Sequence, residues 1–170
     1  MPSLVLWTPF NEGWGQFDAR IASELIRKLD PERLIDHASG WHDQGIGQLQ
    51  SLHVYFTKYR FRPDRRGRAV ILSEYGGYNW SVPGHSWAKK NFGYRAFRNP
   101  ETLLQAYEEL ILGQILPAAE QGLSAAIYTQ LSDVEEEVNG LWTYDRMVQK
   151  LSPVAVRNIN LQLTGGNQRR

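Results

Sequence analysis

Short continuous hydrophobic runs in this sequence alternate with segments in which hydrophobic residues recur every three or four positions. The runs predict buried strands, and the spaced segments predict amphipathic helices. We expect strands over residues 4–7, 34–37, 49–56, 69–74 and 124–130, with the first of them buried on both faces. We expect helices over 17–29, 100–121 and 153–163.

Local signals fix the ends of these helices. Asp30 and Pro31 end the first helix, because proline cannot continue the hydrogen-bonding pattern. Asn99 followed by Pro100 is a typical helix start, with a capping side chain and proline at the first helical position. That helix should run to a stop near Gly122 and kink at Pro117.

The alternation of strands and helices predicts an α/β fold with a parallel sheet. One domain is expected over residues 1–164, followed by a frayed tail over 165–170. A closed eight-stranded barrel takes about 250 residues, so a barrel of this length would lack about three βα units. An open five-stranded sheet is the alternative, and the length by itself favours it.

The bulk composition excludes several classes of function. The 170 residues carry a formal net charge of +1, which gives no field that would recruit nucleic acid or an anionic membrane. Cysteine is absent, which excludes disulfides, thiolate metal sites and cysteine nucleophiles. There is no long apolar run and no basic segment leading into one, so we expect neither a membrane span nor a signal peptide. On these grounds a cytoplasmic location is slightly favoured over others.

Two glutamates lie in the same local setting. Glu12 and Glu74 each come at the end of a predicted strand, close before a glycine. The carboxyl ends of parallel strands share one face of an α/β fold, and active sites are built there. Two carboxylates at that face can hydrolyse a glycosidic bond, one as proton donor and one as nucleophile. A helix-capping or solvated role remains open for either residue on this evidence alone.

Three segments together resemble the family-2 glycoside hydrolases, the β-galactosidase and β-glucuronidase family. The segment from Trp7 through Asn11 and Glu12 to Gln16 is similar to the acid/base segment at the end of barrel strand four. Leu72 to Gly77 is similar to the nucleophile segment of strand seven, and Tyr128 to Asp145 resembles the strand-eight segment of one branch. The resemblance implies a partial (β/α)8 TIM barrel, about strands four to eight with their helices. It covers the chain from Leu4 to about Leu163.

The resemblance also implies roles for individual residues. Glu12 would be the acid and then the base, and Glu74 the nucleophile that forms a glycosyl-enzyme ester. Asn11 would hydrogen-bond the sugar 2-hydroxyl, and Tyr55 would orient the nucleophile or serve as a half-buried strand tyrosine. His53 is expected to line the pocket or to be a hydrogen-bonded core histidine. Trp80 is expected to stack on sugar rings or to pack against a neighbouring domain. The remaining expected substrate-binding residues are Tyr128 and Trp142. Retention implies two carboxyl groups roughly 5–5.5 Å apart. No cofactor and no metal ion are expected.

The sequence departs from the family in what it lacks. No β-sandwich domains and no barrel strands one to three are present, so a missing N-terminal barrel half or self-association is the expected partner, besides a carbohydrate substrate.

The expected activity is retaining hydrolysis of β-linked glycosides, β-galactosidase-like. A truncated carbohydrate-binding or assembly fragment without turnover is the alternative. A nucleotide-binding α/β enzyme would need a phosphate-cradling glycine loop, and residues 11–15 do not have its spacing.

Two charged segments are expected to be solvated loops. The acidic run from Asp133 to Glu137 is no EF-hand loop, because Val138 stands where glycine is required. The arginines between Arg60 and Arg68 are interrupted by Pro63, Asp64 and Gly67, which argues against a nucleic-acid site.

Overall fold

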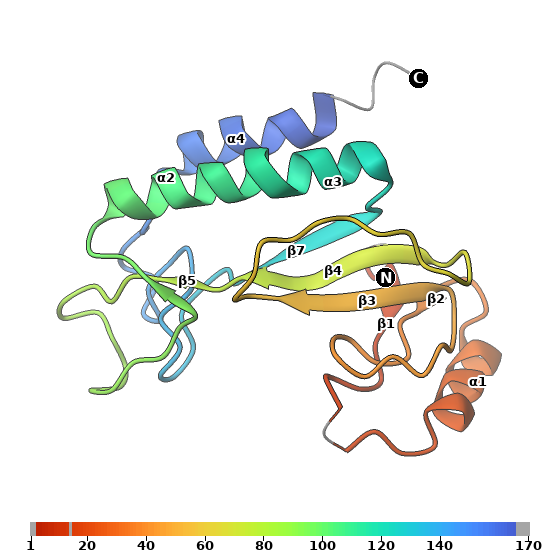
Figure 1. Cartoon of the computed structure of the whole chain (residues 1–170). Coiled ribbons are helices and arrows are strands. Elements are labelled where there is room, and N and C mark those ends of the chain that lie inside the picture. The colour runs from red at the N-terminus through yellow and green to blue at the C-terminus, as the bar shows by residue number, and fades with distance from the viewer. Residues whose placement is uncertain (1–2, 14, 166–170) are drawn as a thin grey trace. The chain divides into compact units, whose positions relative to one another are not determined.

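The chain has a mixed α/β fold with small parallel sheets (Figure 1). The computed structural model describes residues 3–13 and 15–165. Its elements in chain order are β1 (Leu6–Trp7), α1 (Ala19–Leu29), β2 (Leu34–Ile35), β3 (Leu49–Val54), β4 (Ala69–Gly76), β5 (Tyr78–Asn79), β6 (Arg95–Ala96), α2 (Pro100–Leu110), the π-helical segment η1 (Ile111–Ile115), α3 (Leu116–Gln121), β7 (Ala125–Thr129) and α4 (Pro153–Gly165). The expected α/β class is thereby confirmed. None of the helices in this described part has the length and hydrophobicity needed to cross a membrane.

The strands form three small sheets. β1 pairs in parallel with β2, β5 pairs in parallel with β6, and the third sheet has the order β3-β4-β7. Figure 1 shows β3 and β4 running side by side in the same direction. The β5 and β6 pair lies within the segment between Gly76 and Arg98, where the sequence had predicted only a loop.

The residues group into two compact units. The first contains residues 1–53, 61–74 and 122–126, and the second contains 54–60, 75–121 and 127–170. The core of the first unit includes Ile35 of β2 and the consecutive residues Val70, Ile71 and Leu72 of β4, all at most 3% exposed. A strand buried on both faces carries such a continuous hydrophobic run. The strand itself was predicted over residues 69–74.

The expected burial of the first strand is wrong. Val5 is 68% exposed and Trp7 is 39% exposed. Within the described residues β1 pairs only with β2, so one of its edges and much of its side-chain surface are left uncovered.

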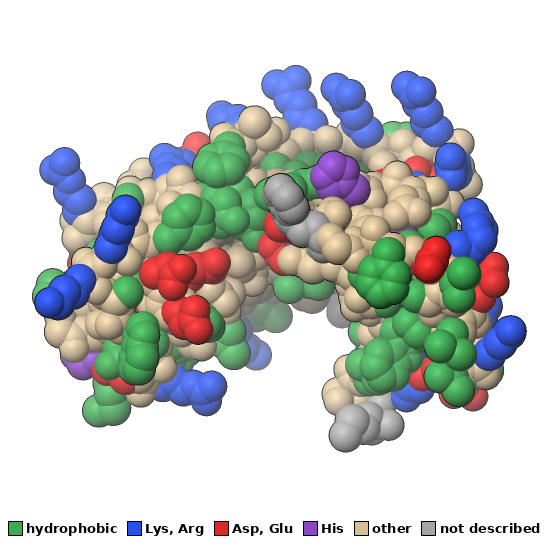
Figure 2. All heavy atoms as spheres, turned by 90° about the horizontal axis from the view of Figure 1, so that it is seen from below, with side chains coloured by type: hydrophobic (Ala, Val, Ile, Leu, Met, Phe, Trp, Pro, Cys, Tyr) green, Lys and Arg blue, Asp and Glu red, His purple; other side chains and the backbone are tan. Residues whose placement is uncertain are grey.

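Helix α1 forms as predicted, but its hydrophobic stripe faces outward. The helix buries the small residues Ala19 and Ser23. Hydrophobic side chains that gather over α1 are exposed (Figure 2): Phe17, Ile21, Leu25 and Leu29. The periodicity therefore predicted the helix correctly, whereas the surface that would cover its apolar face is absent from the described residues.

The long helix of the second unit contains a π-helical turn. Asn99 caps it as predicted, because its Oδ1 accepts a hydrogen bond from the Thr102 amide at 2.9 Å. The irregularity expected at Pro117 is the segment η1, which ends two residues before this proline. Proline lacks an amide hydrogen and its ring crowds the carbonyl four residues earlier, here that of Gly113. The wider π turn at that carbonyl accommodates both constraints, and the helix continues through α3.

The acidic run is not wholly solvated, which corrects the prediction for Asp133. Asp133 is 4% exposed, and its Oδ1 lies 2.7 Å from Nζ of Lys150, which is 1% exposed. Lys150 also donates to the Val138 carbonyl, and the Gly140 amide donates to Asp133. Burial raises the pKa of Asp133 and lowers that of Lys150, while their mutual attraction opposes both shifts. Glu135 and Glu136 are exposed, as expected.

Arg68 likewise departs from the predicted solvated loop. Its side chain is 8% exposed and donates to the carboxylates of Asp43 and Asp64. These hydrogen bonds hold the pKa of Asp64 well below its usual range. The other arginines of this segment are exposed, as predicted. Of the expected frayed tail, residues 166–170 lie outside the described part, and Gly165 is the last residue of α4.

Candidate active site

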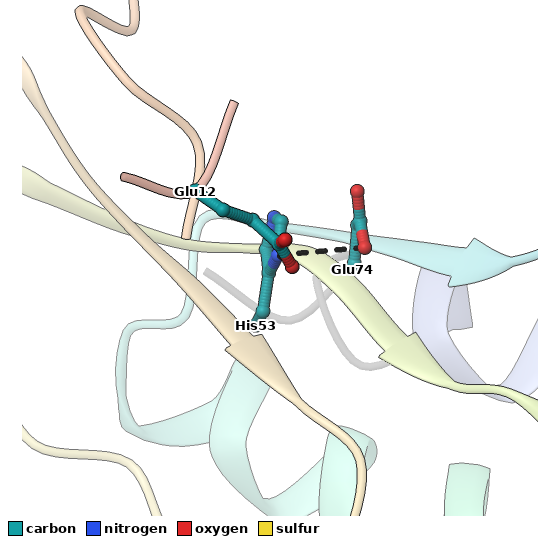
Figure 3. A group of neighbouring side chains, drawn as sticks. All are labelled: Glu12, His53 and Glu74. Carbon is teal, nitrogen blue, oxygen red and sulfur yellow. Dashed lines mark hydrogen bonds and ion pairs between the residues drawn. The ribbon is translucent and has the colours of Figure 1, made fainter. Parts of the chain in front are cut away.

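The structure brings Glu12, His53 and Glu74 together in the first unit (Figure 3). Glu12 follows β1, His53 is in β3 and Glu74 is in β4. Nδ1 of His53 lies 3.0 Å from Oε1 of Glu12 and 3.4 Å from Oε2 of Glu74. One carboxylate oxygen of each glutamate and one histidine nitrogen all lie within 4.8 Å of one another. The three side chains thus converge on one point.

Glu12 is held in an uncommon backbone conformation. Its φ angle of 55° lies in the left-handed region, which non-glycine residues rarely adopt. The Glu12 amide donates to the Ser39 carbonyl at 2.6 Å, and the Ser39 hydroxyl donates to Oδ1 of Asn11 at 2.7 Å. Such local strain costs about 1–3 kcal/mol and is concentrated at functional sites, where surrounding contacts maintain it.

His53 is fully enclosed. Its side chain is 0% exposed and lies on the face of β3 that also buries Leu49 and Ser51. Gly40 allows the ring its position, because a Cβ at residue 40 would lie 2.8 Å from His53 Nδ1. Gly40 also has a φ angle of 99°, which other residues seldom adopt. The orientation of the imidazole ring is therefore fixed by the residues packed around it.

The two carboxylates are partly buried but reachable. The side chain of Glu12 is 21% exposed and that of Glu74 is 32% exposed. Two carboxylates this close repel when both are ionised, and the repulsion is relieved by a proton or by a donor between them. The position of His53 Nδ1 suits such a donor when this nitrogen carries hydrogen.

Buried polar groups in the first unit adjoin this cluster, and they were not predicted from the sequence. Asp36 is 1% exposed, and burial raises its pKa while a hydrogen bond with Ser51 opposes the shift. Ser51 in turn donates to Ser73, the residue before Glu74. The available signal was a charged residue within the short strand expected at Leu34 to His37.

The same three ligand atoms could hold a divalent metal ion. A histidine nitrogen and two carboxylate oxygens suit zinc or manganese, and they lie close enough to share one ion. A metal bound there would occupy both carboxylates.

Four other predicted site residues lie in the second unit: Tyr55, Trp80, Tyr128 and Trp142. The Tyr55 ring stacks on Tyr94 with centroids 3.7 Å apart, and its hydroxyl lies 3.2 Å from Thr129 Oγ1. Tyr128 packs edge-on against Tyr75 and Tyr107, and burial raises its pKa. This environment is typical of a packed aromatic cluster as much as of a sugar-binding surface.

The two predicted tryptophans also belong to the second unit. Trp80 is half-buried, and its amide donates to the Val138 carbonyl at 3.3 Å. Trp142 lines a cavity with Leu131, Ser132 and Arg146. Asn11, at the site of the first unit, is exposed.

Comparison with known proteins gives no assignment for this chain. No family model matches the sequence, and no curated protein matches it. Two accessible carboxylates in close proximity can divide the roles of nucleophile and proton donor, which is the requirement for glycoside hydrolysis.

Proposed function

We propose that this chain carries the catalytic carboxylates of a retaining glycoside hydrolase that acts on β-linked glycosides and is β-galactosidase-like. The observation that carries the proposal is the proximity of Glu12 and Glu74, with one oxygen of each within 4.8 Å of the other. Retaining enzymes place their carboxyl groups roughly 5–5.5 Å apart, whereas inverting enzymes leave about 6.5–9.5 Å for a water molecule. The close spacing favours retention.

In this mechanism ionised Glu74 attacks the anomeric carbon while protonated Glu12 donates its proton to the departing glycosidic oxygen. The aglycone leaves as an alcohol, and an ester joins the sugar to Glu74. Glu12, now ionised, then takes a proton from water as the water oxygen attacks the anomeric carbon. The ester bond to Glu74 breaks, and both glutamates return to their starting states.

His53 is assigned a positioning role in this reaction, in place of the sugar contact expected from the sequence. Its Nδ1 contacts both carboxylates, and its side chain is buried. The hydrogen bond from Ser39 engages the Asn11 amide oxygen, which fixes the amide orientation and suits donation by the Asn11 NH₂ group to a sugar 2-hydroxyl.

The proposed fold is the part of a TIM barrel that contains about strands four to eight. Parallel pairing and the alternation of strands with helices support it. The exposed hydrophobic side chains of β1 and α1 are those that the remaining barrel half, or a second copy, would cover. Sedimentation velocity with thermal unfolding tests this, and a monodisperse monomer that melts cooperatively would count against it.

The activity is tested with a panel of aryl β-glycosides (galactoside, glucoside, glucuronide and mannoside). Turnover of one of them should fall by roughly 10³-fold or more in Glu74→Gln and, for leaving groups that need protonation, in Glu12→Gln. Glu24→Gln is the matched control, because Glu24 is exposed on α1. NMR of the first-formed sugar should show retained β configuration.

Azide separates the two roles. Added to Glu12→Gln with a highly activated substrate, azide should yield a β-glycosyl azide, because the ester on Glu74 still forms. Added to Glu74→Gln, it should yield the α product. Turnover that survives in Glu74→Gln without azide, or an inverted product in the wild type, would overturn the assignment.

A second candidate function is divalent-metal binding at the same cluster, favoured by the three converging ligand atoms. Calorimetric titration with Zn²⁺ tests it. Micromolar binding that is lost in His53→Asn, in a protein that turns over none of the glycosides, would favour the metal site.

A further inference from the structure

A cavity in the second unit has the features of a ligand-binding site. It has a volume of about 310 Å³ and is lined by Leu131, Ser132, Trp142 and Arg146. A volume of about 300 Å³ is at the small end of ligand-binding pockets. The indole of Trp142 and the side chain of Leu131 supply apolar surface, and Ser132 and Arg146 supply the polar groups.

Hydrogen bonds fix the walls of this cavity. The Trp142 amide donates to the Leu131 carbonyl at 3.0 Å, and the Asp133 amide donates to the Trp142 carbonyl at 2.9 Å. Ser132 and Trp142 form a parallel bridge. The two segments that carry the apolar wall are therefore held together by their backbones.

Arg146 is presented by a tightly bonded turn. Its φ angle of 59° lies in the left-handed region, where an arginine is disfavoured, and its amide donates to the Thr143 carbonyl. The carboxylate of Asp145 accepts from the Thr143 hydroxyl and from the Met147 amide. Nδ1 of His85 lies 2.8 Å from the same carboxylate, which ties the turn to a distant loop. The turn thus maintains a strained residue at the cavity wall.

The charge of Arg146 is not neutralised by the protein. Among the residues that the structure describes, no carboxylate forms an ion pair with Arg146, and the neighbouring Asp145 is paired with His85. A guanidinium beside an apolar wall is suited to binding a carboxylate, because it donates two parallel hydrogen bonds to it.

We propose that this cavity binds a six-membered ring that has an apolar face and carries one carboxylate. The ring lies against Trp142, and the carboxylate pairs with Arg146. Aromatic acids of the benzoate class and sugar acids of the hexuronate class share this chemistry. The inference does not depend on glycoside hydrolysis.

Calorimetry or ligand-observed NMR tests the proposal with benzoate and glucuronate, each beside its neutral counterpart, benzyl alcohol or glucose. At least one acid should bind in the millimolar range or tighter, and roughly tenfold more tightly than its neutral counterpart. Binding of benzoate alone identifies aromatic acids, binding of glucuronate alone identifies sugar acids, and binding of both leaves the shared chemistry as the determinant. Failure of both acids to bind, or equal affinity for acid and neutral forms, would overturn the proposal.

Variants test the assigned contacts. Arg146→Gln should weaken binding of the acid roughly tenfold and leave the neutral counterpart unchanged. Arg146→Gly removes the same charge and relieves the backbone strain, so it supplies the test if the glutamine variant folds poorly. Arg157→Gln on α4 is the control, because Arg157 is exposed and does not line the cavity. Unchanged binding in both Arg146 variants would place the ligand elsewhere.

Discussion

At the scale of single residues, one nitrogen of His53 faces the carboxylate pair. Asparagine places an amide NH₂ near the position of histidine Nδ1, whereas glutamine places it near Nε2. Because Nδ1 is the contacting atom, His53→Asn should retain more glycosidase activity than His53→Gln. Losing a hydrogen bond to a charged group costs about 1.5–3 kcal/mol, so His53→Gln should lower kcat about 10–100-fold. Steady-state kinetics on the substrate found in the panel measures both.

Unfolding measurements control this comparison, since both variants alter a buried side chain. If the two variants unfold with similar free energies but differ in kcat, the difference in kcat arises from the contact between residue 53 and the carboxylates. Equal activity in the two would contradict the assigned role of Nδ1.

The buried pair of Lys150 and Asp133 belongs to the same scale. Lys150→Met keeps most of the side-chain volume but leaves the carboxylate of Asp133 buried without its cation. Breaking such a pair costs about 3–5 kcal/mol. Urea unfolding should show this loss, and the double variant with Asp133→Asn should recover part of it, because the buried charge is then removed. A loss below about 1 kcal/mol in Lys150→Met would show that water reaches the pair.

The sequence indicated some of these residues and not others, for a physical reason. Glu74 ends a hydrophobic run and Glu12 follows another in the turn after it, and the segment that follows a strand is a position that local pattern reveals. Lys150 and Asp133 are 17 residues apart, and nothing local distinguishes Lys150 from a solvated lysine. Only the folded chain places its ammonium group beside a buried carboxylate.

At the scale of elements, the turn over residues 143–148 depends on one ionised side chain. Hydrogen bonds from Thr143 and His85 and from the Met147 amide lower the pKa of Asp145 to about 2. A lowered pKa means that the contribution of Asp145 to stability is present above its ordinary value of 3.8 and is lost as the pH falls toward 2. The difference in unfolding free energy between the wild type and Asp145→Ala should therefore shrink between about pH 4 and pH 2.

Thr143→Val checks the origin of this effect, because it removes the first of the hydrogen bonds and should move the transition to higher pH. If the difference in unfolding free energy between the wild type and Asp145→Ala stayed constant over this pH range, the fold would not lower the pKa of Asp145.

Most elements could be predicted from hydrophobic spacing and capping residues, and their departures have local explanations. β4 and α2 occur as expected, because a continuous hydrophobic run and an Asn99 cap are strong signals. The pairing of β5 with β6 was not predicted, since each strand has two residues and shows no periodicity. The π-helical turn before Pro117 was not predicted, because it depends on how the folded chain relieves the crowding of a carbonyl by the proline ring.

At the scale of the whole molecule, hydrophobic residues fall into two classes that the sequence does not distinguish. Ile35 is 0% exposed, whereas Leu25 is 56% exposed, although both are hydrophobic residues of predicted elements. Ile35→Ala should lower the unfolding free energy by about 2–5 kcal/mol. Leu25→Lys should change it by less than about 0.5 kcal/mol in the isolated chain, because the side chain is already in water.

Chemical denaturation of the two variants at several protein concentrations measures both quantities. A large cost for Leu25→Lys that grows with concentration would mean that α1 is covered by another copy of the chain.

Gly40 has a consequence for tracing this site in other genomes. Any side chain there would both strain the backbone and displace the His53 ring, yet neither proposed catalytic residue would change. A homologue with both glutamates but with alanine at this position should be a weakened enzyme, because the contact of His53 with the carboxylates is disturbed. Searches that score only the two glutamates would rank it with fully active relatives, whereas a search that also requires the glycine would set it apart.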